Sequence, residues 1–116
     1  VYSLHDTKLL VDLVGPAQDK RILFSGQLLD AVEAQRIGLI EIVSDDVQAE
    51  GEKLAVAIAE NSSYSVRGVK SVVRRILDGQ ADDDATTLRL FADAFTGEDF
   101  AEGVAAFLEK RKARFK

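Results

Sequence analysis

The chain has 116 residues, 47% of them hydrophobic, so it is one domain or part of one with enough apolar side chains for a core. It contains no cysteine, which excludes disulfides, thiolate metal sites and cysteine nucleophiles. The net charge is −5, but residues 110–116 carry five basic side chains and no acid, unlike the broad basic face of a nucleic-acid-binding protein. No apolar run approaches the ~18 residues of a membrane span, and no signal peptide is visible, so we expect a cytoplasmic protein without a membrane or nucleic-acid partner.

Helical patterns broken by glycine and proline fill the first part of the chain. Residues 1–6 carry no pattern, and Thr7 is placed to cap the first helix. Gly15 and Pro16 separate the first two helices, because glycine suits the residue after a helix and proline suits the first turn of the next. Asp30 is placed to cap a third helix. The predicted elements are helices over 8–14, 17–24 and 31–37, followed by a strand or extended link over 39–43.

Four more helices are predicted in the second part, and the last two meet at a tight corner around Gly97. Thr96 and Asp99 have the spacing of a capping box, which predicts that the Thr96 side chain caps the last helix. The complete pattern therefore predicts a mainly α fold with six or seven helices and at most one short strand. These four helices cover about 45–60 and 64–77, a segment from 82–84 through Phe91, and a segment after Gly97.

One of these helices, over 64–77, has two contrasting faces. Its apolar residues are spaced to face inward, and its basic residues form a stripe that we interpret as solvated. The apolar set is Val66, Val69, Val73, Ile76 and Leu77, and the basic set is Arg67, Lys70 and Arg74.

Few residues have the pattern of a catalytic or metal site. His5 is the only histidine, and with Asp6 it could orient a general base, although adjacent side chains are rarely placed for that role and no nucleophile motif accompanies them. A polar loop is the interpretation that we favour for this pair. Nearly all paired carboxylates stand at helix starts, where capping and the helix dipole explain them. No acidic or histidine spacing predicts a metal site, and no glycine pattern predicts a phosphate loop.

The basic tail over 110–116 is the remaining candidate site. Cations are favoured at a helix C-terminus by the helix dipole alone, so the tail needs no ligand to explain it. Alternatively, a lysine or arginine pairs with a phosphate while Phe115 packs on an apolar or purine surface. The residues by themselves leave both interpretations open.

Four stretches, in order, resemble the C-terminal part of the enoyl-CoA hydratase/isomerase (crotonase) superfamily. Together they extend over essentially the whole chain, and four motifs in the same order are more specific than any one of them. The stretches are LVGPA at 13–17, LFSGQLLDAVEAQRIGL at 23–39, IAENSSYSVRGVK at 58–70 and FADAFTGEDFAEGVAAFLEKRKARF at 91–115.

The resemblance implies a fold and a function. Residues 1–116 would be the helical C-terminal region that follows an N-terminal ββα spiral and drives trimer formation, usually within hexamers. The chain begins at Val1 and has no methionine, so we expect it to be the back part of a longer protein. The family acts on acyl-CoA thioesters without a cofactor, and a true hydratase adds water to a 2-enoyl-CoA. Its catalytic glutamates and oxyanion-hole amides would precede Val1, so the resemblance places no catalytic residue here.

The resemblance also implies which residues could contact a ligand. The final helix and tail of the family lie near CoA, which points to Phe107, Lys110 and Phe115 in this chain, and less strongly to Lys112 and Arg114. The acyl-pocket loop of the family would fall on residues 2–10, with His5 and Asp6 replacing paired glycines and Thr7 in register. These bulkier residues put an ordinary hydratase acyl pocket in doubt.

Two alternatives remain beside the hydratase interpretation. One is a helical module for self-association or CoA binding without catalysis. The other is a sister reaction of the same superfamily, namely isomerisation, dehalogenation or decarboxylation.

Overall fold

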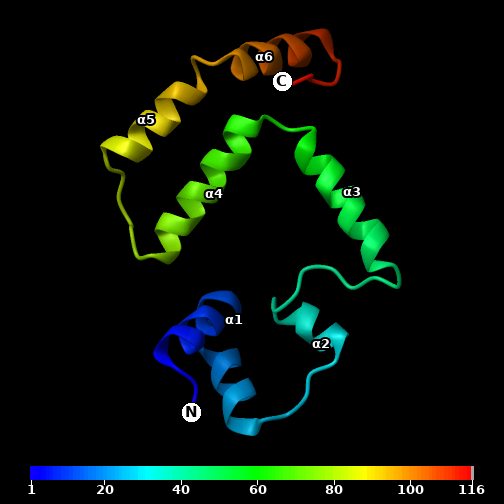
Figure 1. Ribbon diagram of the computed structural model, residues 1–116, viewed down its shortest axis with the longest axis vertical. Coiled ribbons are helices and arrows are strands. Elements are labelled where there is room, and N and C mark those ends of the chain that lie inside the picture. Colours follow the sequence, from blue (N-terminus) through cyan, green and yellow to red (C-terminus); the bar gives the residue numbers. More distant parts are fainter. Residues whose placement is uncertain (116) are drawn as a thin grey trace. The chain divides into compact units, whose positions relative to one another are not determined.

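The computed structural model describes residues 1–115 and confirms the mainly α fold (Figure 1). Six helices and no strand occur in this range, and the 39–43 run is an irregular link. The chain divides into two units, Val1–Gln48 and a second that starts at Ala49, and each is described by itself. The helices are α1 (Leu4–Ser25), α2 (Ala31–Arg36), α3 (Val47–Ala59), α4 (Ser63–Leu77), α5 (Ala85–Ala94) and α6 (Glu98–Glu109).

Helix α1 starts earlier than its sequence predicts. Ser3 is its N-cap: the Ser3 hydroxyl accepts from the Asp6 N–H at 3.0 Å and donates to the Asp6 carboxylate at 2.7 Å. Thr7 lies inside the helix, and its hydroxyl donates to the Ser3 carbonyl at 2.9 Å. The predicted irregular segment over 1–6 is therefore confirmed for residues 1–3 and wrong for residues 4–6. The prediction of a Thr7 cap is wrong, because Ser3 satisfies the free amides four residues earlier. The predicted break at Gly15 is confirmed, since this residue has φ 79° and ψ 161° within α1.

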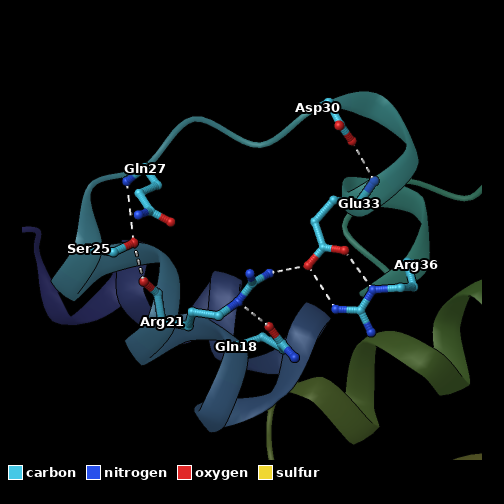
Figure 2. Close-up of polar contacts among 7 residues, drawn as sticks. All are labelled: Gln18, Arg21, Ser25, Gln27, Asp30, Glu33 and Arg36. Atoms are coloured by element: carbon cyan, nitrogen blue, oxygen red, sulfur yellow. Dashed lines mark hydrogen bonds and ion pairs between the residues drawn. The ribbon is translucent and has the colours of Figure 1, made fainter.

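Charged side chains join α2 to the second half of α1 (Figure 2). The Glu33 carboxylate accepts from Arg21 at 2.5 Å and from Arg36 at 2.6 and 2.7 Å. The two guanidinium groups, chiefly that of Arg36, lower the pKa of Glu33 to about 2. Asp30 caps α2 as predicted, accepting from the Glu33 N–H at 2.8 Å.

In the second unit, α4 and α5 pack against each other at Gly68 and Leu90. Gly68 is buried in α4, and the side chain of Leu90 in α5 lies 3.6 Å from the position of a Cβ at Gly68. The Tyr64 hydroxyl donates to the Leu90 carbonyl at 2.8 Å. The link between the two helices is fixed by Arg75, which donates to Asp84, the N-cap of α5, at 2.8 Å.

Most large apolar side chains are not covered within the described part of the chain. Among residues 1–115, only Ala34 and Ala106 are buried hydrophobic residues. The predicted inward face of α4 is open to solvent, with Val69, Val73 and Ile76 exposed by 63%, 49% and 60%. The prediction that these residues face inward is therefore wrong within residues 1–115, although the basic stripe beside them is solvated as expected. None of the helices in residues 1–115 is both long and apolar enough to cross a membrane.

Candidate functional site: an aromatic pocket under the C-terminal tail

A pocket of about 650 Å³ lies in the second unit, between α6, the start of α4 and the end of α5. We call it the aromatic pocket, because four of its lining residues are phenylalanines. Carboxylates at the corner between α5 and α6 line it as well. The lining includes Phe95, Phe100, Phe107, Phe115, Ser62 and Asp99.

A hydroxyl group at the start of α4 fixes one end of the aromatic pocket. Ser62 is buried, caps α4 by accepting from the Ser65 N–H at 3.2 Å, and donates to the Asp99 carboxylate at 2.5 Å. Asp99 lies in the first turn of α6, so this pair joins two helix starts. The rings of Phe95 and Phe100 meet edge to face, with centroids 5.3 Å apart, and continue the same wall.

The start of α6 corrects one prediction from the sequence. Gly97, not Thr96, is the N-cap, and it supplies no side-chain hydrogen bond. The Thr96 hydroxyl instead donates to the Asp93 carbonyl at 3.1 Å, at the end of α5. The capping box is absent because Thr96 belongs to the preceding turn, where its N–H also donates to the Asp93 carbonyl.

The end of α6 turns the chain back on itself. Lys110 adopts the left-handed conformation, with φ 54° and ψ 39°, and is the one non-glycine residue with positive φ in residues 1–115. The Lys110 N–H donates to the Phe107 carbonyl at 3.3 Å and the Arg111 N–H to the Ala106 carbonyl at 3.0 Å. This pair of bonds is a Schellman motif, which usually has glycine at the left-handed position.

Acidic side chains hold the returning tail, chiefly Glu102, and Glu109 also accepts from the Arg111 guanidinium at 2.5 Å. Both oxygens of Glu102 accept from the Arg111 guanidinium, at 2.6 and 3.0 Å, and Glu102 Oε1 also accepts from the Arg114 N–H at 2.7 Å. The Arg111 guanidinium, helped by that backbone N–H, lowers the pKa of Glu102 to about 2. In the opposite direction, Glu102 and Glu109 raise the pKa of Arg111. The tail is therefore fixed across α6.

The three residues suggested for CoA contact lie close together in this arrangement. Phe107 and Phe115 both line the aromatic pocket, and Phe107 is 82% exposed. Lys110 is exposed at the turn between them and makes no ion pair with the other residues of 1–115. Lys112, in contrast, pairs with Glu60 at 2.6 Å. The last basic residue of the predicted tail, Lys116, lies outside the described residues.

The three residues suggested for an acyl pocket lie in the first turn of α1, in the other unit. Asp6 and Thr7 bond to Ser3, and both line a smaller pocket of about 310 Å³ with Leu10, Ile22 and Leu23. His5 is exposed. The segment is therefore helical where a loop was expected, and its contact with an acyl group stays a prediction.

Two contacts of the site were not found by sequence reasoning. The sequence predicts that the segment Asn61, Ser62 and Ser63 ends one helix and caps the next, and Ser62 is that cap, but its contact with Asp99 is not predicted. Glu102 carries no sequence signal of its own. The spacing of Glu102 and Arg111 predicts their ion pair only if the helix is known to end, and the chain to reverse, at Lys110. Within residues 1–115, no group of three or more histidine and acidic side chains could hold a metal ion.

The fold and site define a helical region whose aromatic pocket is lined in part by Phe115 of the basic tail. Residues 3–116 match the family model described as enoyl-CoA hydratase/isomerase. The chain belongs to this family.

Relatives and solved structures agree with this assignment. A crotonyl-CoA hydratase of Syntrophomonas wolfei is 36% identical over 115 residues, covering 94% of this chain and 43% of the relative. A probable enoyl-CoA hydratase of Mycobacterium bovis is 35% identical, covering 91% of this chain and 42% of the relative. The crystal structure of an enoyl-CoA hydratase/isomerase family protein from Hyphomonas neptunium superimposes with a TM-score of 0.86 at 38% identity, over 100% of this chain and 45% of that one. The chain thus spans less than half the length of these relatives.

Proposed function

We propose that residues 1–116 form the helical C-terminal region of an enzyme that acts on acyl-CoA thioesters, contributing part of the CoA site and of a subunit interface. The observation that carries the CoA proposal is the placement of Phe107 and Phe115 on one pocket with the exposed Lys110 at the turn between them. An aromatic surface suits adenine or the apolar parts of CoA, and an ammonium group suits a phosphate.

The charges around α6 suggest how CoA would be oriented. Glu98 and Asp99 lie at the start of the helix, where they disfavour a phosphate. Lys110 follows the other end, about 18 Å along the axis at 1.5 Å per residue. The partial negative charge of the helix C-terminus also disfavours anions, so the Lys110 ammonium has to supply the attraction. We therefore place the phosphates beside Lys110 and the apolar parts of CoA toward the aromatic pocket.

Isothermal titration of CoA into Lys110→Gln and wild-type chains tests this placement. Loss of a charge-assisted hydrogen bond, about 1.5–3 kcal/mol, should weaken CoA binding roughly tenfold or more. Lys70→Gln is the matched control, because Lys70 is an exposed lysine of α4 away from the pocket. No CoA binding by the wild-type chain, or equal losses in both variants, would contradict the proposal.

Hydration of a 2-enoyl-CoA is the reaction that we propose for the complete enzyme. It is favoured over isomerisation, dehalogenation and decarboxylation because both relatives described above are named as hydratases. We expect the catalytic groups to come from outside residues 1–116, as the resemblance implies. The chain alone should therefore not hydrate crotonyl-CoA in a spectrophotometric assay, and measurable turnover would show that it holds a catalytic site of its own.

Self-association is the second function that a specific observation favours. The exposed valines and isoleucine of α4 form an apolar face that nothing in residues 1–115 covers, and such faces mark interfaces. We propose that it packs against another part of the assembled protein, in a trimer or hexamer. Val73→Asp should reduce the association state measured by light scattering, whereas Lys70→Asp on the solvated stripe should not. A monomeric wild-type chain would remove the support for this role.

A further inference from the structure

The tail over 110–115 is a strap across α6, and its fixing points are unequal. Arg111 is bound through two guanidinium nitrogens to both oxygens of Glu102, and the Arg114 N–H adds a third hydrogen bond to the same carboxylate. Lys112 contributes a single ion pair with Glu60 between exposed side chains. Paired two-point hydrogen bonds between arginine and a carboxylate are the stronger and more directional kind, whereas isolated exposed pairs contribute little.

The strap ends in the aromatic pocket. Phe115 directly follows Arg114, whose N–H is held 2.7 Å from Glu102, and the Phe115 ring lines the pocket beside Phe107. Phe115 is half-buried although it is the last described residue, whereas Phe107, in the regular part of α6, is largely exposed. The contact that directly precedes Phe115 is the one between the Arg114 N–H and Glu102. Glu109, at the end of α6, bonds to the third guanidinium nitrogen of Arg111 at 2.5 Å and so acts at the turn.

We propose that Glu102 is a latch that holds the strap closed, so that its release moves Phe115 away and opens the aromatic pocket. Glu102 does not line that pocket; it acts through Arg111 and Arg114 as a positioning residue. The proposal concerns access to the pocket and holds whether or not CoA is what enters it.

Two separate sets of contacts set the path of the strap, one at the turn and one after it. The Schellman motif at Lys110 reverses the chain through backbone hydrogen bonds alone, and Glu102 then fixes the direction of the next four residues. Removing the Glu102 charge should leave the turn in place and free only the residues after it. The expected change is therefore local, without loss of α6.

Tryptophan fluorescence tests the latch, because the chain contains no tryptophan. In a Phe115→Trp chain the single indole reports whether position 115 lies in the pocket. We expect blue-shifted emission and weak quenching by acrylamide. Adding Glu102→Gln should shift the emission to the red and raise the quenching constant severalfold, while far-UV circular dichroism shows unchanged helix content.

Glu60→Gln in the same Phe115→Trp chain is the matched control, since it removes the Lys112 pair from the same strap. Its emission and quenching should stay close to those of the parent. Arg111→Lys, which keeps the charge but loses the two-point geometry, should resemble Glu102→Gln. The latch is refuted by a parent indole that is already solvated, by equal quenching in Glu102→Gln and parent, or by an equally large effect of Glu60→Gln. These readouts need no CoA, so they can fail or succeed separately from the CoA proposal.

Discussion

The Ser62 hydroxyl joins the starts of two helices, since it accepts from the first turn of α4 and donates to Asp99 in the first turn of α6 at 2.5 Å. The two residues are 37 positions apart in the sequence, and Ser62 is buried at 7% exposure. One side chain therefore completes a helix cap and fixes a wall of the aromatic pocket.

Ser62→Ala should lower the free energy of unfolding by about 1–2 kcal/mol, because it removes an N-cap and leaves a carboxylate without its partner. Urea denaturation followed by circular dichroism measures this change. Ser71→Ala, at an exposed position inside α4, is the control and should be neutral or slightly stabilising, since alanine is the better helix former. Equal midpoints for the two variants would contradict the structural role of Ser62.

Tyr64→Phe should cost about 0.5–1.5 kcal/mol of stability, since it removes the hydrogen bond to the Leu90 carbonyl and leaves the ring in place. Tyr2→Phe makes the same chemical change at an exposed residue for which the structure shows no such bond. Thermal unfolding of both variants distinguishes the stability lost with the hydrogen bond from the general effect of removing a hydroxyl group. A loss in Tyr2→Phe as large as that in Tyr64→Phe would rule out the assigned contact.

Two glycines should respond in opposite directions to alanine. At Gly68 the helical backbone suits alanine, and the new Cβ would lie 3.6 Å from Leu90, an ordinary contact, so stability should rise by about 0.5–1 kcal/mol. At Gly15, φ 79° and ψ 161° are nearly exclusive to glycine, so alanine should destabilise by about 1–3 kcal/mol. Chemical denaturation of each variant measures the sign, and destabilisation by Gly68→Ala would show that α4 and α5 are closer than described.

Two lowered pKa values predict acid sensitivity. The pKa values of Glu33 and Glu102 are about 2 in the folded chain, against an ordinary value of 4.5. Because the folded values are lower, the stability from these carboxylates is complete above about pH 4.5 and is lost as the pH falls toward 2. Urea midpoints measured across this range should fall less steeply in Glu33→Gln and Glu102→Gln than in the wild type.

Glu41→Gln is the control for this titration. It removes a carboxylate that the structure does not place in an arginine pair among residues 1–115. Its pH profile should keep the wild-type slope. A wild-type slope in the Glu33 and Glu102 variants as well would mean that neither arginine pair forms in solution.

The sequence predicts the helices well, because apolar spacing and the breakers between elements are local signals. Its errors concern the choice between neighbouring capping residues. Ser3 and Thr7 are both good N-caps, and only the structure shows that Ser3 is used. Thr96 fails as a cap because its N–H and its hydroxyl both donate to the Asp93 carbonyl in the preceding turn, and Gly97 takes the N-cap position.

The family resemblance, not the residue pattern, pointed to Phe107, Lys110 and Phe115 as ligand contacts, and that role stays a prediction. The place of Phe115 in the pocket depends on a chain reversal at Lys110, which is not the glycine that signals such a turn. The apolar pattern of α4 identified a face without indicating what covers it. Periodicity reports which residues share a side of a helix, and it carries no information about the surface that covers them.

The distance along α6 between Glu102 and the turn at Lys110 determines whether Arg111 can reach Glu102. These residues are eight positions apart, which corresponds to about 12 Å and slightly more than two turns. One residue inserted between them would advance the turn by about 1.5 Å and rotate it by about 100°, carrying Arg111 away from Glu102. The segment should therefore tolerate substitutions that keep the volume of the side chain. A change in the length of α6, by contrast, would move Phe115 out of the aromatic pocket.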